Sequence, residues 1–571
     1  MKKNQRNTLG QKKYLAAIIP IIMAMQSQGA EFYAGGIEGS FESEISLGSS
    51  WRVEAQDSKF IGGANESEDD GDANFSKGDA FSQVFKGSHE LQVSYQNFGG
   101  FVRGKYWYDS ALADNNVDSG HLPTATVGGQ TQLQVIQPGE SRLDDSEFDE
   151  LSKFSGAQLL DAYVYGEFTL LDMPVDVRLG KQVVSWGEST FIMGGVNAIN
   201  PIDVNAFTRP GAEIKEVLLP VNMAYFSVGL TDNLSAEAFY QLEYQETVIP
   251  GCGTFFSTSD TAAPGCNSIS IADGVFNVAR DDDGQRLAKD SGQFGLALRY
   301  VSEALGDTEF GLYAMNIHSR APIVSSIKHG VDGATQTAIT QGAVAAYTAG
   351  DATSAYLQSK FATPADFVSY SVTKARAATG TYYVIYPEDI QIAGLSFATN
   401  VGSMALSGEI THKKDVPLQI NGPTLVGALL GAPTNSPELN ASNDATDFGS
   451  EAELFRFDVS QVQATAVKFF DQVAGASRMT LVGEVGYTFI HGFDDGRDAI
   501  KFGRSDIFGP LTDDTANDGF VTTSSWGYRG RVTADYSDVF AGINLKPMLA
   551  WSEDVKGYAP QPGGNFSEGQ K

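Results

Sequence analysis

The residues that could support chemistry are few and widely spaced in this sequence. The two cysteines, Cys252 and Cys266, lie on one segment rich in Gly, Ser, Thr and Pro. Their spacing does not fit a zinc site, in which paired cysteines are separated by about two to four residues and further ligands follow. In an exported protein such a pair favours a disulfide, with two unlinked thiols as the alternative. We expect Cys252 and Cys266 to be joined.

The histidines and acidic loops provide no catalytic or metal-binding motif. The six histidines form neither an HExxH motif nor a close pair on one face, and G-x-S-x-G and Walker A motifs do not occur. The acidic segments 67–72 and 281–284 lack the register of an EF-hand; solvated loops are favoured over weak Ca²⁺ or divalent-bridged lipopolysaccharide sites. We therefore assign no catalytic, cofactor-binding or metal-binding residue and expect no cofactor.

The overall composition excludes two large classes of protein. The 571 residues include 39 basic and 70 acidic side chains, which gives a formal charge of −31. This charge argues against nucleic acid as a partner, because neutralising phosphates requires clusters of Lys and Arg. Beyond the N-terminus, no segment has the roughly 18 unbroken apolar residues of a membrane-spanning helix. The high Gly (62) and aromatic (11%) contents indicate an all-β protein.

The first 30 residues are organised like a secretory signal peptide. Basic residues without an acid lie within residues 2–13, an apolar run follows over residues 14–25, and small residues precede Glu31. The alternative, an N-terminal membrane anchor, requires a longer apolar run. We expect cleavage after Gly29 or Ala30, which leaves residues 31–571 as the exported domain.

Alternation of apolar and polar residues predicts many β-strands. At about 9 to 11 residues, the predicted strands are long enough to cross a bilayer when tilted, and many end in an aromatic residue. About fifteen such segments are present, near residues 41–53, 89–98, 101–108, 162–171, 174–184, 221–230, 234–244, 292–301, 308–318, 391–398, 402–412, 458–470, 478–490, 524–536 and 540–551.

Short and long connections alternate between these strands. Short turns are expected at residues 99–100, 171–173, 231–233, 302–306, 400–401, 471–476 and 537–538. Long polar stretches lie at residues 54–88, 109–158, 245–290, 319–390, 413–457 and 491–523. This asymmetry is typical of outer-membrane barrels, whereas a secreted β-sandwich does not need it and a β-solenoid needs a fixed repeat. We predict a transmembrane antiparallel β-barrel in a Gram-negative outer membrane, with a periplasmic N-terminus.

The strand count predicts an open sheet. Bacterial single-chain barrels have an even number of strands, so we expect about 16–18 strands in the complete barrel, with C-terminal strands missing here or the count wrong by one. Segments 41–53 and 540–551 both run outward and could pair only in parallel. We therefore expect a gap between them.

One connection, within residues 178–223, is too apolar for an external loop in water. We expect it to fold into the barrel and narrow the lumen, with a loop that caps the outer rim as the alternative. The residues predicted at this constriction are Lys181, Trp186, Glu188, Asp203, Arg209 and Glu213. The residues predicted to face the lumen elsewhere are Arg103, Lys105, Arg178, Glu237, Gln241, Glu243, Arg299, Glu409, Glu484, Arg529 and Arg531. Both charges are present, so the pattern indicates no simple ion selectivity.

The same connection carries a family resemblance. Its sequence, RLGKQVVSWGESTFIMGGVNAINPIDVNAFTRPGAEIKEVLLPVNM, resembles the signature of the domain-of-unknown-function family DUF1302 of Gram-negative outer-membrane proteins; the cysteine segment and WSEDVKGYAPQPGGNF at residues 551–566 are similar too. The resemblance covers the chain from about residue 41 and implies a barrel in outer-membrane lipid and lipopolysaccharide. It also implies proximity to a resistance-nodulation-division (RND) type exporter and a periplasmic lipid-handling protein, and it implies no reaction.

Together these patterns favour a channel or transporter for small organic or lipid-like molecules. The alternatives are a surface adhesin or structural barrel, suggested by the long loops, and a barrel lipid hydrolase. A hydrolase needs a Ser or Asp at the rim paired with a His, and His318 is the strand-end candidate. We expect the protein not to be an enzyme. The identity of the substrate cannot be inferred from the sequence.

Overall fold

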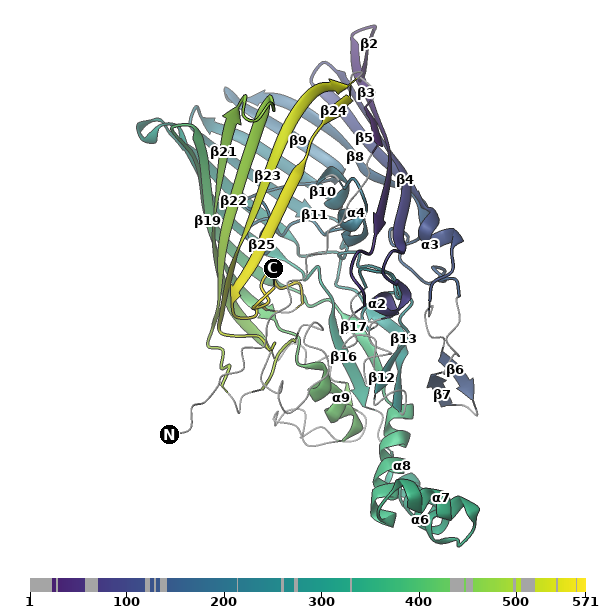
Figure 1. Cartoon of the computed structure of the whole chain (residues 1–571). Coiled ribbons are helices and arrows are strands. Elements are labelled where there is room, and N and C mark those ends of the chain that lie inside the picture. The colour runs from purple at the N-terminus through teal and green to yellow at the C-terminus, as the bar shows by residue number, and fades with distance from the viewer. Residues whose placement is uncertain are drawn as a thin grey trace, which may run out of the picture.

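A strongly curled antiparallel sheet makes up most of the molecule in the computed structural model (Figure 1). The structure describes residues 23–26, 29–56, 70–118, 124–127, 130–133, 141–212, 214–257, 261–271, 276–328, 331–431, 446–447, 455–496, 500–504, 519–540, 543–560 and 562–570. None of the helices in these ranges is both long and apolar enough to cross a membrane.

The sheet has 18 described strands, and fifteen of them, all but β1, β2 and β24, form one continuous run. Each strand of this run pairs antiparallel with the next, in the order β3 (Ile37–Trp51), β4 (Ala80–Tyr95), β5 (Phe98–Asp109), β8 (Ser155–Leu170), β9 (Met173–Gln182), β10 (Val221–Thr231), β11 (Leu234–Gln241), β14 (Phe294–Ser302), β15 (Thr308–Ile317), β18 (Ile390–Val401), β19 (Met404–Pro417), β21 (Arg456–Asp471), β22 (Arg478–His491), β23 (Ser524–Phe540) and β25 (Met548–Lys556). The predicted fold class, an antiparallel β-barrel of the transmembrane type, is confirmed.

The two edges of the run are not joined to each other in the described part of the chain. The short strands β1 (Met23–Gln26) and β2 (Ala30–Ala34) pair with β3, and β24 (Ile543–Leu545) pairs with β23. No pairing links β25 to β1, β2 or β3 among the described residues, and Figure 1 shows β25 and β3 at separate edges. The expected gap is therefore present. Most of the expected signal peptide lies outside the described residues.

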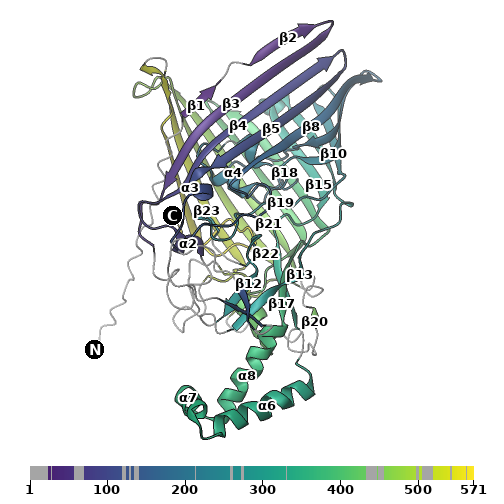
Figure 2. The ribbon, with the colours of Figure 1, turned by 90° about the vertical axis from the view of Figure 1, so that its right-hand side faces the viewer.

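Short turns lie at one rim and long loops at the other, as the sequence predicts (Figure 2). Some of the short turns were predicted in the wrong place. Residues 99–100 lie within β5, and the turn falls earlier, at Gln96, whose φ is 54°. A Cβ on Gly99 would lie 2.2 Å from the ring of Tyr165, so this glycine leaves room for an aromatic ring on the neighbouring strand. The turn predicted at residues 537–538 is also misplaced, because β23 continues to Phe540.

The barrel wall has an apolar outer face and an inner face that carries both polar and apolar side chains. Side chains alternate along each strand, and the outward positions include Val164 (61% exposed), Leu296 (61%) and Leu395 (54%). Inward positions instead carry buried polar residues such as Glu409 and Glu484. Exposed apolar residues outside and buried polar residues inside are the arrangement that a surrounding bilayer requires.

The long loops contain structure that the sequence analysis did not predict. They form a second sheet in the order β12 (Ser268–Ile271), β13 (Phe276–Arg286), β17 (Thr381–Ile385), β16 (Ile323–Lys328) and β20 (Thr446–Asp447). Helices α6 (Gly333–Thr348), α7 (Ala352–Lys360) and α8 (Pro364–Thr379) extend away from the barrel (Figures 1 and 2). Smaller elements are α2 (Asp70–Asn74), α3 (Ser110–Asp114), β6 (Thr124–Val127), β7 (Gln130–Leu133), α9 (Gly422–Leu430) and the 3-10 turn Glu303–Leu305.

The predicted disulfide joins Cys252 and Cys266. Both cysteines are fully buried in a cluster that includes Phe75, Phe81 and Phe148. Three long loops contribute to this cluster, so the disulfide lies where they pack together.

Candidate functional site

The connection between β9 and β10, residues 183–220, lies inside the barrel; we call it the lumen segment. It contains the short helices α4 (Val204–Thr208) and α5 (Ile214–Val217), and Figure 1 shows α4 within the curled sheet. Its apolar residues Trp186, Val196 and Ile199 are at most 1% exposed. They pack against inward side chains of β10, β11, β14, β15 and β18, so the apolar character of the segment is explained by burial against the inner wall.

Two glutamates of the opposite wall hold the first half of the lumen segment. Glu409 on β19 accepts hydrogen bonds from the backbone N–H of Glu188 (2.6 Å) and Val196 (2.9 Å). Glu484 on β22 accepts three more, from Thr190 (2.9 Å), Phe191 (2.6 Å) and Ile192 (2.8 Å). A buried backbone N–H without a partner is unfavourable. These two carboxylates therefore satisfy the irregular backbone of the segment across the lumen.

Neighbouring side chains of the wall donate further hydrogen bonds to the two glutamates. Gln463 donates to Glu409 at 2.9 Å, and Thr465 donates to Glu484 at 3.1 Å. Burying a carboxylate is costly unless hydrogen bonds compensate. Glu409 is 4% exposed and Glu484 3%, so their charges are compensated by donors from both the wall and the lumen segment.

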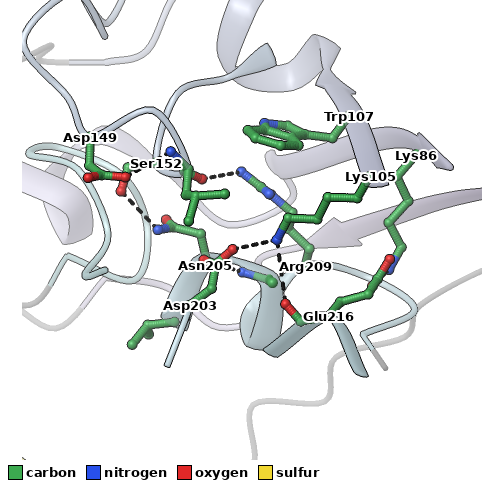
Figure 3. A network of polar contacts seen from close by, with 12 residues as sticks. Lys86, Lys105, Trp107, Asp149, Ser152, Asp203, Asn205, Arg209 and Glu216 are labelled. Atoms are coloured by element: carbon green, nitrogen blue, oxygen red, sulfur yellow. Dashed lines mark hydrogen bonds and ion pairs between the residues drawn. The ribbon is translucent and has the colours of Figure 1, made fainter. Parts of the chain in front are cut away.

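The second half of the lumen segment binds to the wall formed by β4 and β5 (Figure 3). Lys105 Nζ lies 2.7 Å from the Asp203 carboxylate, which also caps the N-terminus of α4. Lys86 forms an ion pair with Glu216. The Arg209 guanidinium lies 4.8 Å from the centre of the Trp107 ring, within the range of a cation–π contact. The segment is thus fixed to walls on both sides of the lumen.

The C-terminal tail also contacts the lumen segment. Asn565 accepts a hydrogen bond from the Met193 N–H (3.1 Å) and donates one to the Met193 carbonyl (2.5 Å). Phe566 packs with Ile192 and is 1% exposed. The part of the lumen segment around Ile192 and Met193 is therefore also attached to residues 565 and 566.

The structure brings four of the six predicted constriction residues into the lumen segment. Trp186 donates from Nε1 to Glu237 at 2.7 Å, and Asp203 and Arg209 make the contacts described above. Lys181 instead belongs to β9, where it lies near Asp161. Glu213 lies outside the described residues.

The Glu188 carboxyl has a strongly shifted pKa. Burial raises the pKa of its carboxyl to about 7, and the nearby Glu309 and Glu409 act in the same direction. The positive charge of Arg299 opposes this shift.

Most of the predicted lumen-facing residues make contacts within the barrel. Arg299 bonds both Glu237 and Glu309 at 2.8 Å. The other placements are as follows: Arg103 with Glu90 and Asp161 (both 3.2 Å), Arg178 with Asp176 (2.8 Å), Gln241 with the Ile199 carbonyl (3.0 Å), Arg529 with Asp554 (2.7 Å), and Arg531 over the Phe191 ring (5.0 Å). Glu243 lies beyond the end of β11 and bonds Asn222 at 2.8 Å.

Sequence reasoning missed Lys86, Glu216 and Asn565 as partners of the lumen segment. Lys86 and Glu216 are separated by 130 residues and Asn565 and Met193 by 372, and no local pattern indicates such pairs. Lys86 does lie at an inward position of β4 in the alternation, which is the signal that could have identified it.

His318 is not arranged as a catalytic base. It is fully buried. Its Nε2 lies 2.9 Å from the Ser291 carbonyl, and its Nδ1 accepts the Asp389 N–H at 3.0 Å. Both ring nitrogens are therefore engaged by backbone. Over the ranges that the structure describes, no group of three or more His, Cys, Asp or Glu residues is placed to hold a metal ion.

Solved structures with similar folds are outer-membrane barrels. They include Salmonella typhi OmpF in complex with daunomycin (8% identity, 92% of this chain and 94% of that chain, TM-score 0.34) and the outer membrane channel DcaP of Acinetobacter baumannii (8%, 92% and 99%, 0.32). An anion-selective porin from Comamonas acidovorans is similar as well (8%, 97% and 96%, 0.31). At these identities and TM-scores the similarities carry no inference about function.

The sequence is more informative than the fold about the protein family. No curated protein matches it. A family model described as "Protein of unknown function (DUF1302)" matches residues 12–571, which is nearly the whole chain. The segment that resembles the family signature is the one that fills the lumen. The chain therefore belongs to the DUF1302 family.

Proposed function

We propose that this protein is an outer-membrane channel for small organic molecules with an apolar body, and that the lumen segment narrows its path. The observation that carries the proposal is the attachment of this segment to opposite walls, through Glu409 and Glu484 on one side and Lys105 on the other. A loop that only capped the outer rim would not need carboxylates on the far wall. An ordered constriction does need them, because its shape must be fixed to select solutes.

The inner wall supports the choice of substrate class. Three arginines lie over aromatic rings at inward positions, with distances to the ring centres of 5.3 Å (Arg103 and Phe101), 5.2 Å (Arg178 and Tyr225) and 5.7 Å (Arg299 and Tyr313). Each pair places an aromatic ring beside a cation, and carboxylates of the wall partner all three cations. The rings favour solutes with an apolar body, so we infer that such solutes pass more readily than sugars of similar size.

The outer face of the wall indicates in which membrane environment the barrel lies. Its apolar belt fits outer-membrane lipid, and the long loops on one rim fit the side that carries lipopolysaccharide. We place the short turns and the N-terminus in the periplasm. On that side an RND-type exporter and a lipid-handling protein would supply or receive the substrate.

Liposome swelling tests the proposal directly. The full chain is reconstituted in phospholipid vesicles, and swelling rates are compared for a fatty carboxylate, an aromatic carboxylate and neutral sugars of similar size. We expect faster entry of the carboxylates. In planar bilayers, deletion of residues 193–206 should raise single-channel conductance. Vesicles that exclude every solute would contradict a channel and favour an adhesin, and unchanged conductance would contradict the constriction.

A further inference from the structure

A polar cluster lies on the outer face of the barrel, away from the lumen. Ser460 on β21 is flanked by two histidines from the neighbouring strands: its Oγ lies 3.0 Å from His412 Nδ1 and 2.8 Å from His491 Nε2. On the far side of the first ring, His412 Nε2 lies 4.0 Å from the Asp458 carboxylate. The two imidazole rings are 5.4 Å apart. The cluster thus places a hydroxyl, two imidazoles and a carboxylate next to one another.

The strand register fixes the depth of this cluster. Ile410, Val462 and Tyr487 pair across the same three strands, and they are 48%, 47% and 43% exposed on the outer face. Two residues further toward the long-loop rim, His412 pairs with Ser460. The cluster therefore begins one outward position beyond the apolar belt. In a bilayer this level is where acyl chains meet headgroups, and ester bonds of lipids lie there.

The arrangement activates the Ser460 hydroxyl. A hydroxyl has one proton, so it can donate to only one of its two imidazole partners, and the other must donate its own N–H to the oxygen. Asp458 Oδ2 lies 4.0 Å from His412 Nε2, the ring nitrogen that does not contact Ser460. His412 is therefore the ring suited to take the proton, as in other serine–histidine–carboxylate groups. His491 then orients the oxygen.

We propose that Ser460 is the nucleophile of a second site, which hydrolyses acyl esters of lipids in the outer leaflet. Ser460 Oγ bonds to the ester carbonyl carbon while its proton moves to His412 Nδ1. The bond from that carbon to the lipid alcohol oxygen breaks, and the alcohol takes the proton. Water then attacks the acyl-serine and gives a proton to His412, which returns it to Ser460 Oγ. The products are a free fatty acid and a lysolipid.

A matched pair elsewhere on the outer face serves as a control. Ser43 on β3 and His89 on β4 also form a cross-strand hydrogen bond. This pair lies beside Phe41, which is 42% exposed and stacks on His89. It is therefore surrounded by the apolar belt rather than placed at its edge, and we expect Ser43 to be unreactive.

Active-site labelling tests the proposal on the full chain in detergent micelles. A long-chain alkyl fluorophosphonate is added, and the modified residue is mapped by mass spectrometry. We expect the label on Ser460, its loss in Ser460→Ala and His412→Ala, and its retention in Ser43→Ala. His491→Gln should retain more labelling than His491→Ala, because Gln keeps an N–H donor. The heat-dependent gel shift of each variant shows that the barrel is folded.

Turnover gives the second readout. Mixed micelles of phosphatidylethanolamine and, in a separate arm, of lipid A distinguish the two sources of the ester. Release of fatty acid from either one, lost in Ser460→Ala, supports the proposal. An unlabelled Ser460 in the folded protein, labelling that survives His412→Ala, or a labelled Ser460 that releases fatty acid from neither lipid would overturn it.

Discussion

At the scale of single residues, the first half of the lumen segment depends on carboxylates that bind backbone rather than cations. Glu484 accepts three consecutive N–H groups, from Thr190 to Ile192. These groups belong to irregular backbone that lacks a strand partner, and hydrogen bonds to a charged acceptor contribute about 1.5 to 3 kcal/mol each. Glu309, by contrast, faces the same lumen but binds Arg299 of the wall. This difference provides a test with a matched control.

We predict that Glu484→Gln raises single-channel conductance or open-state noise. The amide keeps one acceptor oxygen, but its NH₂ group faces an N–H that previously donated. A loss of about 1.5 to 3 kcal/mol increases the undocked population of the segment by about ten- to a hundredfold. Planar-bilayer recording measures the effect. Glu309→Gln should not raise conductance, because removing that charge relieves the repulsion of Glu188 in the docked segment. Equal traces for Glu484→Gln and the unmodified protein would show that Glu484 does not hold the segment.

Glu188 makes the attachment of the segment depend on pH. Burial first, and then Glu309 and Glu409, raise its pKa to about 7, whereas a solvated Glu titrates near pH 4.3. Between these values the docked segment binds more protons than the undocked one. Docking is therefore strongest below about pH 4.3, weakens as pH rises to about 7, and changes no further above it.

We accordingly predict that conductance increases between about pH 5 and pH 7 and that Glu188→Gln removes this increase. Gln is neutral throughout the range, so the docked form no longer takes up a proton. Conductance recorded at fixed ionic strength from pH 4 to pH 8 checks the expectation. A Glu188→Gln channel with the original slope would assign the pH dependence to another group.

At the scale of elements, the sequence predicts the wall well and the loops poorly. Strand alternation and turn length are local, so all the long strands of the barrel could be found. The sheet formed by β12, β13, β16, β17 and β20 could not, because its strands come from separate loops and all but β13 have six residues or fewer. Helix α8 left a readable signal: Thr363 and Asp366 form a capping box with Pro364 in the first turn. That motif predicts a helix start.

The candidate site, too, could be predicted only in part from the sequence. The apolar content of residues 178–223 predicts burial, and the alternation places Glu409 and Glu484 on the inner face. Their pairing with Thr190 or Val196 joins residues more than 200 positions apart. Only the curling of the wall brings these partners together, so the attachment points could not be predicted from the sequence. The outward cluster around Ser460 was missed because it depends on the register of three neighbouring strands.

The disulfide belongs to this scale because it orders loops rather than strands. We predict that replacing both Cys252 and Cys266 with Ser accelerates limited proteolysis within residues 242–293. A disulfide that closes a loop of about 15 residues contributes up to about 3 kcal/mol in the chain-entropy model. The strands do not depend on it, so the heat-dependent gel shift of the barrel should be unchanged. Proteolysis at the original rate would mean that the cluster around Phe75 and Phe148 suffices without the covalent bond.

At the scale of the whole molecule, the two edges of the curled sheet decide how it sits in lipid. The bilayer interior offers no hydrogen-bond partners, so an unpaired strand edge there is unfavourable. β3 and β25 are the first and fifteenth strands of an antiparallel run and point the same way. In the described part of the chain, the pairings of β25 are all with β23, whereas β21 pairs on both sides, with β19 and β22.

This asymmetry predicts a gradient of backbone protection across the barrel. We expect amides in residues 548–556 to exchange with deuterium faster than those in residues 456–471, because only the latter lie between two strands. Hydrogen–deuterium exchange of the full chain in detergent micelles, read by mass spectrometry, measures both segments in one sample. Peptides from β4, which pairs with β3 and β5, give an internal reference for two-sided pairing. Equal protection of β25 and β21 would mean that the outer edge of β25 has found a partner, either β1 and β2, which run antiparallel to it, or strands of another chain.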